Sequence, residues 1–335
     1  MSLMLYTRRE LGKMALAVPA ASLIRFQAKP DSKINGVQIG LNVPYSFGNN
    51  LMPADETLRD CVQLGVSAVE LRSQPVEAFM GVPTELLRRA SQKADVDALR
   101  QPRLSASMDK AKALRNHWED AGVRIEILKL DGIYNMTDDV LDYGFTLAKT
   151  VGARAISCEI SADGTKRVGE FADKHKLMVG YHGHAETAPE HWEAAFKQAK
   201  YNGANVDIGH FVAGNNTSPL PFITEYHDRI THVHVKDRKK NKGPNVPFGE
   251  GDTPIKEVLQ LLRDKKWNIQ ATIEFEYPIP AGSDRMAEIA QLHSDERGKT
   301  LDRGLIGGSA HAWSHSLSIL PIVPNQGQAA RPRSA

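Results

Sequence analysis

Carboxylate and imidazole side chains gather in the second half of the sequence, where they end or follow short apolar segments. Both side-chain types bind Mn²⁺, Mg²⁺, Co²⁺ or Zn²⁺, and both move protons near neutral pH. The two cysteines, Cys61 and Cys158, are far apart, and no His/Cys set has the spacing of a zinc finger. The spacing instead predicts a mixed oxygen and nitrogen site for a divalent cation. The residues are Glu159, His182, His184, Asp207, His210, His232, His234, Lys236, Glu274 and Glu276.

The segments that carry these residues repeat along the chain. Short β-branched runs alternate with amphipathic helical patterns at a spacing of roughly 30 residues, which indicates parallel βαβ units. Eight such units predict an α/β fold, a single-domain (β/α)8 TIM barrel over residues 34–292. No Gly-x-Gly-x-x-Gly motif follows a strand, which disfavours a doubly wound dinucleotide-binding sheet. The expected strands are 37–41, 68–72, 124–129, 155–160, 177–182, 204–208, 232–236 and 271–276.

Two parts of the chain fit this repeat less well. The second unit, between Arg72 and Arg124, is longer than the others, and we expect its outer helix to carry an insertion. After the last strand, the helical pattern of 285–292 is short for a helix that closes a barrel. Residues 293–335 lack helical periodicity and are predicted to form an irregular tail.

The barrel hypothesis places the chemistry at one end of the fold. Active sites of TIM barrels lie where the strands end, and the fourth to eighth strands each end in a carboxylate or an imidazole. Strand alternation predicts that His232, His234 and Lys236 share one side. By the same rule, Glu274 and Glu276 share a side. A single such histidine is often a hydrogen-bonded structural group, and a single aspartate often caps a helix, but five consecutive strands favour a metal site.

Four motifs together resemble the xylose isomerase-like TIM barrels, over about residues 37–290. That superfamily holds sugar-phosphate isomerases and epimerases, ketose 3-epimerases, inosose dehydratases and the endonuclease IV nucleases. The resemblance implies a metal-dependent enzyme. The motifs are His182-Gly-His184, Val-Asp207-Ile-Gly-His210, His232-Val-His234-Val-Lys236-Asp and Ile-Glu274-Phe-Glu.

The resemblance also assigns roles to residues. In the epimerase branch, Glu, Asp, His and Glu from late strands hold one divalent metal, and the two glutamates act as acid and base on opposite faces of the sugar. The histidines of the fifth and sixth strand ends line the substrate pocket. By position, these roles fall on Glu159, Asp207, His234 and Glu274 as ligands, on Glu159 and Glu274 as catalytic residues, and on His182, His184 and His210 as substrate-binding residues.

Two basic residues beyond the seventh strand remain open to two interpretations. Lys236 and Arg238 could hold a sugar oxygen or an anionic group of the substrate. They also belong to the charged run that begins at Lys236, which is typical of a solvated surface. We include both among the expected substrate-binding residues.

This site predicts chemistry beside a carbonyl group. A bound cation stabilises the enediolate that forms when a carboxylate removes a neighbouring proton. The leading hypothesis is a sugar isomerase or epimerase. A 3-keto-glycoside lyase, which expels a β-substituent from the same intermediate, is the alternative. An apurinic endonuclease is disfavoured because the first three strands offer little beyond Asn42 and Glu70 as ligands, and a non-catalytic sugar-binding barrel is disfavoured because both glutamates are present.

The first 28 residues read as an export signal. A basic region with the pair Arg8-Arg9 precedes an apolar run over 14–24, which is about half the length of a membrane span and resembles a twin-arginine signal. We therefore expect a periplasmic or secreted protein without a membrane span. Such a protein meets free sugars or glycosides more readily than sugar phosphates.

Charge and composition narrow the classes of partner. The 335 residues carry 42 Lys and Arg against 40 Asp and Glu, a net charge of +2, so the chain lacks the basic excess of a nucleic-acid-binding protein. A hydrophobic share of 41% is ample for a folded core. The expected partner is a small carbohydrate, with no nucleic acid; assembly into a homo-oligomer is left open.

Overall fold

The computed structural model describes residues 29–89 and 93–298. Within those ranges, no helix is both long enough and apolar enough to cross a lipid bilayer. The predicted export signal over 1–28 lies outside the described residues, as does the predicted tail beyond residue 298. Export and the periplasmic or secreted location therefore stay predictions.

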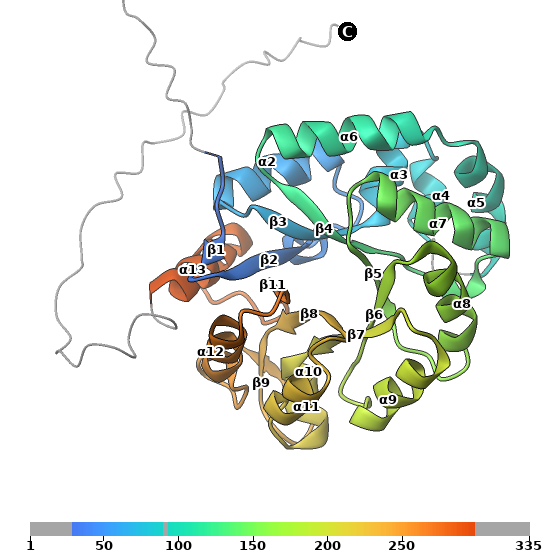
Figure 1. The fold of residues 1–335 in the computed structure, drawn as a ribbon. Helices are drawn as coiled ribbons and strands as arrows, with labels where there is room; N and C mark the ends of the chain where they lie inside the picture. Colours follow the sequence, from blue (N-terminus) through green and yellow to red (C-terminus); the bar gives the residue numbers. More distant parts are fainter. Residues whose placement is uncertain (1–28, 90–92, 299–335) are drawn as a thin grey trace, which may run out of the picture.

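Eight parallel strands close into a barrel, which confirms the predicted fold. Each strand pairs with its neighbour along the chain, and the last pairs in parallel with the first. Figure 1 shows the helices arranged around this ring of strands. A short strand, β1 (Lys33–Ile34), pairs antiparallel with the first barrel strand. The barrel strands are β2 (Val37–Val43), β3 (Ala68–Arg72), β4 (Arg124–Lys129), β5 (Ala155–Glu159), β6 (Met178–His182), β7 (Asn202–Asp207), β8 (Ile230–Val235) and β11 (Gln270–Ile273).

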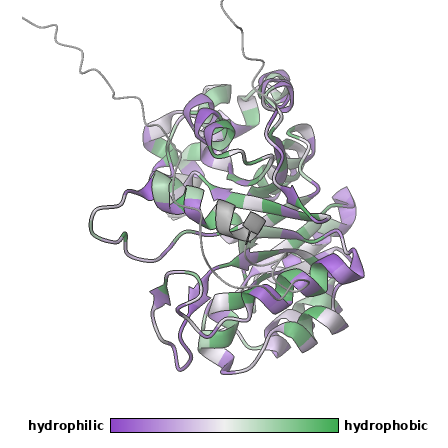
Figure 2. Ribbon diagram, turned by 90° about the vertical axis from the view of Figure 1, so that its left-hand side faces the viewer, coloured by the Kyte–Doolittle hydropathy of each residue, from purple (hydrophilic) through white to green (hydrophobic). Residues whose placement is uncertain are grey.

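The helices that surround the barrel are amphipathic. In α12 (Ile255–Lys265), for example, Val258, Leu259 and Leu262 are buried, whereas charged residues of the same helix face water. Figure 2 shows this alternation as green and purple segments along the helices. Burying such apolar stripes against the strands stabilises each βα unit. The other helices outside the second unit are α2 (Ala54–Leu64), α7 (Asp138–Thr150), α8 (Thr165–His175), α9 (Pro189–Gln198), α10 (Ile208–Asn215), α11 (Leu220–Glu225) and α13 (Arg285–Gly298).

Short elements complete the loops at the carboxyl ends of the strands. A one-turn 3-10 helix follows β2, and another follows β4. A two-stranded hairpin follows β8 and lies apart from the barrel sheet. These elements are η1 (Tyr45–Phe47), η2 (Ile133–Asn135), β9 (Asp237–Arg238) and β10 (Asn245–Val246).

The long second unit consists of four helices in the structure. They are α3 (Ser73–Met80), α4 (Thr84–Leu87), α5 (Lys93–Ser105) and α6 (Met108–Asp120). A small apolar cluster of Val82, Leu87 and Leu99 joins them beside the main core. The insertion expected from the sequence is therefore a packed helical layer on the outside of β3 and β4.

A buried ion pair holds this helical layer together. Arg103 of α5 donates from Nε to Glu77 of α3 at 2.7 Å, and both side chains are 1% exposed. The hydroxyls of Ser73 and Tyr143 also contact the Glu77 carboxylate. Removing one partner from such a pair leaves an unpaired buried charge. We expect Glu77→Leu to lower the free energy of unfolding by about 3–5 kcal/mol, measured by urea denaturation.

An exposed pair provides the control for this experiment. Arg115 and Glu119 of α6 form an ion pair whose side chains are about 40% exposed. Exposed pairs contribute about 0–1 kcal/mol, so Arg115→Ala should have little effect. The double variant Glu77→Leu/Arg103→Met should recover much of the stability because it buries no lone charge. A loss in Glu77→Leu no larger than in Arg115→Ala would contradict the argument.

The observed strands differ from the predicted ones mainly at their ends. β8 ends before Lys236, and β11 ends before Glu274, so these residues follow their strands directly. The residues predicted to lie on the same side of each strand do so in the structure. His232 and His234 both contact Glu70, and Glu274 and Glu276 both contact Lys236. At the end of the barrel, α13 runs beyond 292, where the irregular tail was predicted to begin, to residue 298.

Candidate metal centre

Four buried side chains converge at the carboxyl end of the barrel. His182, Asp207 and His234 end or lie near the end of β6, β7 and β8, and Glu274 follows β11. One ligand atom from each lies within 4.8 Å of those of the other three. The strand register produces this convergence, since Asp207 lies directly opposite His234 in the β7–β8 pair. We call these four residues the ligand cluster.

The atoms that face one another in the ligand cluster lack hydrogen-bond partners. His182 Nε2, Asp207 Oδ2 and His234 Nδ1 are buried and accept or donate no hydrogen bond. His182 Nε2 lies 3.5 Å from Asp207 Oδ2, and His234 Nδ1 lies 3.3 Å from Glu274 Oε2. Two ligands held at about 2.1 Å by one cation are separated by about 3–4 Å. The cluster therefore fits one divalent ion, and its two imidazoles and two carboxylates suit Mn²⁺, Mg²⁺, Co²⁺ or Zn²⁺.

Lys236 supplies positive charge beside the ligand cluster. Its Nζ lies 2.9 Å from Asp207 Oδ2, 2.5 Å from Glu274 Oε2 and 2.6 Å from Glu276 Oε2. Burial opposes the charge on Glu274, but Lys236 and His234 outweigh it and hold the pKa of Glu274 well below its ordinary value. Burial likewise opposes ionisation of Asp207, and His210 and Lys236 lower its pKa. Both carboxylates are thus ionised at neutral pH, as metal ligands must be.

Glu70 lies behind the cluster on β3 and was not assigned a role from the sequence. Its Oε2 lies 2.5 Å from His234 Nε2 and 3.2 Å from His232 Nε2, and all three side chains are fully buried. Burial disfavours a charge on His234, but Glu70 and Glu274 raise its pKa to about 10. A carboxylate on one ring nitrogen of a metal-binding histidine orients the other nitrogen. Glu70 therefore directs His234 Nδ1 into the ligand cluster.

Glu159, predicted as both ligand and catalytic residue, lies one contact away from the ligand cluster. Its Oε2 is 2.9 Å from His182 Nδ1 and 2.8 Å from His184 Nε2, and its Oε1 accepts from Lys129 at 2.6 Å. Burial opposes the charge of Glu159, but His182, His184 and Lys129 lower its pKa well below the ordinary value. In this geometry His182 occupies the place in the cluster that the resemblance gave to Glu159. The role of Glu159 as a ligand stays a prediction.

The Glu159–His184 pair is accessible, unlike the ligand cluster. The side chains of Glu159 and His184 are 47% and 53% exposed. The hydrogen bond to Glu159 raises the pKa of His184. A carboxylate paired with an imidazole at the mouth of a candidate metal site can accept one proton and donate another.

His210 and Arg238 meet on the other side of Asp207. Asp207 Oδ1 accepts from the backbone N–H of His210 at 2.7 Å, which caps α10, while Oδ2 faces the ligand cluster. The capping and metal-binding interpretations of this aspartate therefore apply to different oxygens. His210 Nε2 lies 3.2 Å from Lys236 Nζ, and Arg238 Nη1 lies 2.5 Å from His210 Nδ1. Burial lowers the pKa of His210 to about 4.

Residues of β2, η1 and β10 contact the two glutamates that follow β11. Asn42, on β2, donates to Glu274 Oε1 at 2.7 Å. The Tyr45 hydroxyl donates to Glu276 Oε1 at 2.6 Å, and Asn245 donates to Glu276 Oε2 at 3.2 Å. Asn42 and the carboxylate that it holds are far apart in the sequence, so spacing alone does not pair them.

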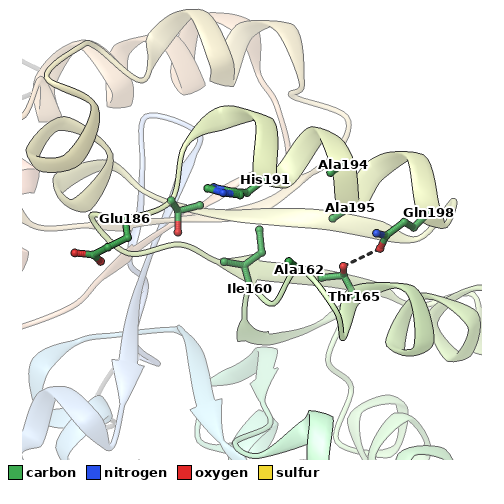
Figure 3. Close-up of a pocket in the computed structure, with 9 residues that line it drawn as sticks. Ile160, Ala162, Thr165, Glu186, His191, Ala194, Ala195 and Gln198 are labelled. Atoms are coloured by element: carbon green, nitrogen blue, oxygen red, sulfur yellow. Dashed lines mark hydrogen bonds between the residues drawn. The ribbon is translucent and has the colours of Figure 1, made fainter.

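Two cavities are lined by residues near the ligand cluster but by none of its four members. One of about 400 Å³ is lined by Tyr45, Asn245 and Glu276, among others. Another, of about 320 Å³, is lined by Glu159, by Arg72 at the end of β3, and by residues of the loops and helices that follow β2, β3 and β4. A third hollow, of about 270 Å³, lies between α9 and the segment leading into α8, as Figure 3 shows. Its histidine, His191, accepts the backbone N–H of Ala188 and so caps α9.

A family model and several curated proteins are similar to this chain in sequence. A family model described as xylose isomerase-like TIM barrel matches residues 58–294. An inosose dehydratase of Lactiplantibacillus plantarum is 28% identical over 153 residues, which are 39% of this chain and 51% of that protein. An inosose dehydratase of Clostridium tetani is 25% identical over 137 residues, which are 34% of this chain and 46% of that protein. This chain spans about half the length of the curated relatives that it matches.

Solved structures share the fold at low identity. The probable 3-DHS dehydratase of Bacillus anthracis superimposes with a TM-score of 0.56 at 14% identity, covering 78% of this chain and 100% of that one. A xylose isomerase domain protein of Planctomyces limnophilus gives 0.54 at 15% identity, covering 78% and 96%. A xylose isomerase-like TIM barrel protein of Mycobacterium smegmatis, in complex with magnesium, gives 0.51 at 13% identity, covering 77% and 94%. These likenesses support the barrel fold.

Proposed function

The chain belongs to the xylose isomerase-like TIM barrel family, and we propose that it is a metal-dependent lyase acting on a keto-sugar or keto-polyol. The observation that carries this proposal is the buried ligand cluster beside the accessible Glu159–His184 pair. A divalent cation in the cluster would polarise the substrate carbonyl and stabilise the negative charge on its oxygen. The named relatives, which are dehydratases, favour elimination over isomerisation.

The chain's own residues divide the reaction between them. The ionised Glu159 carboxylate accepts the proton from the carbon beside the carbonyl. The electrons of that C–H bond form the enolate, which then expels an oxygen substituent from the next carbon. His184 donates the proton that this oxygen needs, so the products are water or an alcohol and an unsaturated ketone. His182, between Glu159 and Asp207, keeps the proton-accepting carboxylate next to the cluster.

A sugar isomerase or epimerase is the second candidate. Glu274, a member of the ligand cluster, is an ionised carboxylate that follows β11, and β11 lies across the barrel from β5, which carries Glu159. Two carboxylates on different sides allow a proton to leave one face of a carbon and return to the other. Each of these carboxylates is contacted by three residues, but the Glu274 side chain is 5% exposed whereas that of Glu159 is 47% exposed, so Glu274 is the less accessible of the two.

Incubation in heavy water distinguishes the two reactions. We expect the Mn²⁺-loaded protein, mixed with a panel of keto-sugars and their glycosides, to release water or the alcohol and to produce the ultraviolet absorbance of an unsaturated ketone. Chelation of the metal should stop this release, and added Mn²⁺ should restore it.

The same experiment contains the outcomes against the proposal. Deuterium in an intact sugar, with no substituent lost, would establish isomerase or epimerase chemistry instead. A metal-loaded protein that binds the sugars but neither exchanges nor releases anything would be a binding barrel. Cleavage of abasic DNA with no sugar reaction would favour the endonuclease branch.

A further inference from the structure

We propose that the cavity beside Glu159 binds a second sugar ring, so that the substrate is a glycoside or disaccharide rather than a single ring. This inference rests on the proposed lyase function, because it places the leaving group in that cavity. The cavity has a volume of about 320 Å³, within the range of small-molecule sites. We call it the distal pocket; its lining residues are Asn50, Leu51, Arg72, Gln74, Leu87, Arg88, Asp131 and Glu159.

Unpaired polar atoms show which chemistry the distal pocket accepts. Asp131 Oδ2 accepts from Arg72 Nη1 at 2.5 Å and from Gln74 Nε2 at 2.8 Å. Because a carboxylate only accepts, this contact fixes the Gln74 amide with its nitrogen toward Asp131. Arg72 Nε and Gln74 Oε1 are then left buried, with no hydrogen-bond partner.

One unpaired donor and one unpaired acceptor select for hydroxyl groups. A hydroxyl donates one hydrogen bond and accepts others, so a polyhydroxylated ring can satisfy both Arg72 Nε and Gln74 Oε1. A carboxylate or phosphate would satisfy the arginine but not the glutamine oxygen. Buried polar groups without partners are costly, so a ligand that supplies both bonds binds favourably.

The walls of the distal pocket are held in place before any ligand binds. The Arg72 guanidinium lies 5.0 Å from the centre of the Tyr45 ring, and the Tyr45 hydroxyl is bonded to Glu276 on the far side of the ligand cluster. Leu87 and Arg88, at the end of α4, form the outer wall. The insertion that lengthens the second βα unit therefore supplies part of this pocket.

Glu159 connects the distal pocket to the proposed reaction. It lines the pocket, and it contacts His182 of the ligand cluster and His184, the proposed proton donor to the leaving oxygen. A ring whose ketone lies at the ligand cluster therefore has its leaving oxygen near His184. On this proposal, the group attached through that oxygen lies in the distal pocket, which Glu159 lines.

Binding of unreactive sugars tests the pocket without requiring turnover. We would titrate the Mn²⁺-loaded full chain with a one-ring probe, methyl β-D-glucopyranoside, and with two-ring probes, methyl β-cellobioside and methyl β-maltoside, using saturation-transfer NMR. We expect the better two-ring probe to bind about tenfold more tightly than the one-ring probe, because the second ring gains two hydrogen bonds. Gln74→Leu should abolish this preference, and Arg88→Ala, at an exposed position, should weaken it.

A matched glutamine provides the control. Gln198 accepts from Thr165 at 2.7 Å in the outer hollow of Figure 3, away from the barrel mouth, so Gln198→Leu should keep the two-ring preference. Equal affinities for one-ring and two-ring probes in the unaltered chain would overturn the proposal, as would a preference that survives both Gln74→Leu and Arg88→Ala. A preference for methyl β-glucuronide over methyl β-D-glucopyranoside that survives Gln74→Leu would assign the pocket to a carboxylate instead, because a carboxylate pairs with Arg72 and not with the Gln74 oxygen. None of these outcomes depends on the lyase reaction.

Discussion

Glu159→Gln is expected to keep its bound metal and to lose turnover by about 10²–10⁴-fold, whereas Asp207→Asn is expected to lose the metal itself. The difference follows from where the two carboxylates lie. Asp207 is fully buried, and its Oδ2 lies 3.5 Å from His182 Nε2 within the ligand cluster. Glu159 is half exposed. Its two oxygens contact Lys129, His182 and His184, and neither oxygen contacts Asp207, His234 or Glu274.

The amide in Glu159→Gln preserves the shape of the side chain but cannot accept a proton from carbon. The ligand cluster still offers His182, Asp207, His234 and Glu274, so its affinity for a cation should change little. In Asp207→Asn, a charged ligand becomes a neutral amide, and the remaining groups hold Mn²⁺ less well. The cap of α10 survives in this variant because the amide oxygen can still accept the His210 N–H.

Two measurements on each variant separate these effects. Electron paramagnetic resonance titration gives the dissociation constant for Mn²⁺, and the heavy-water assay gives the rate at saturating metal. Equal loss of Mn²⁺ in both variants would contradict the geometry and would make Glu159 a ligand, as its likeness to the epimerases implies. Full activity of Glu159→Gln would remove it from the proton transfer altogether.

The fold could be predicted from the sequence because the same strand-and-helix pattern is repeated along the chain. Alternating β-branched and amphipathic segments recur along the whole barrel, and one ambiguous unit does not change the count of eight. The late strands were also informative, since residues such as Asp207 and His234 stand at strand ends, where barrel chemistry is found.

The exact ligands could not be predicted in the same way. Glu159 and His182 lie directly opposite each other on neighbouring strands, so strand position alone does not tell which side chain reaches the centre. The structure directs His182 inward and leaves Glu159 at the mouth. The choice depends on contacts such as Lys129 to Glu159, which join different strands.

Early-strand residues such as Glu70 and Asn42 were noted as isolated polar residues, but their partners lie on strands far along the chain. His234 is 164 positions from Glu70, and Glu274 is 232 positions from Asn42. One feature of the sequence could have indicated the role of Glu70. It is a carboxylate in the middle of the buried strand 68–72, and a buried carboxylate is stable only when a hydrogen-bond or ion-pair partner lies beside it. Only closure of the barrel identifies that partner as His234, a member of the ligand cluster.

The second large effect that we expect is a loss of Mn²⁺ affinity when Glu70 is replaced. We expect Glu70→Gln to weaken Mn²⁺ binding by about 10-fold and Glu70→Ala by about 100-fold, although neither variant alters a member of the ligand cluster. The carboxylate 2.5 Å from His234 Nε2 holds that nitrogen as the donor and leaves Nδ1 free to bind the metal. Glutamine keeps an acceptor oxygen but loses the charge, and alanine loses both, so the two substitutions should form a graded series.

Loss of folding must be distinguished from loss of orientation in this series. Glu77 is another fully buried glutamate, but it lies in the outer helical layer, paired with Arg103. Glu77→Gln should lower stability while leaving the Mn²⁺ dissociation constant of the folded protein unchanged. Glu70→Gln should change that constant even at temperatures where circular dichroism shows the chain fully folded. If Glu70→Gln binds Mn²⁺ as tightly as the unaltered chain, the carboxylate does not orient His234, and the contact between them serves only to neutralise a buried charge.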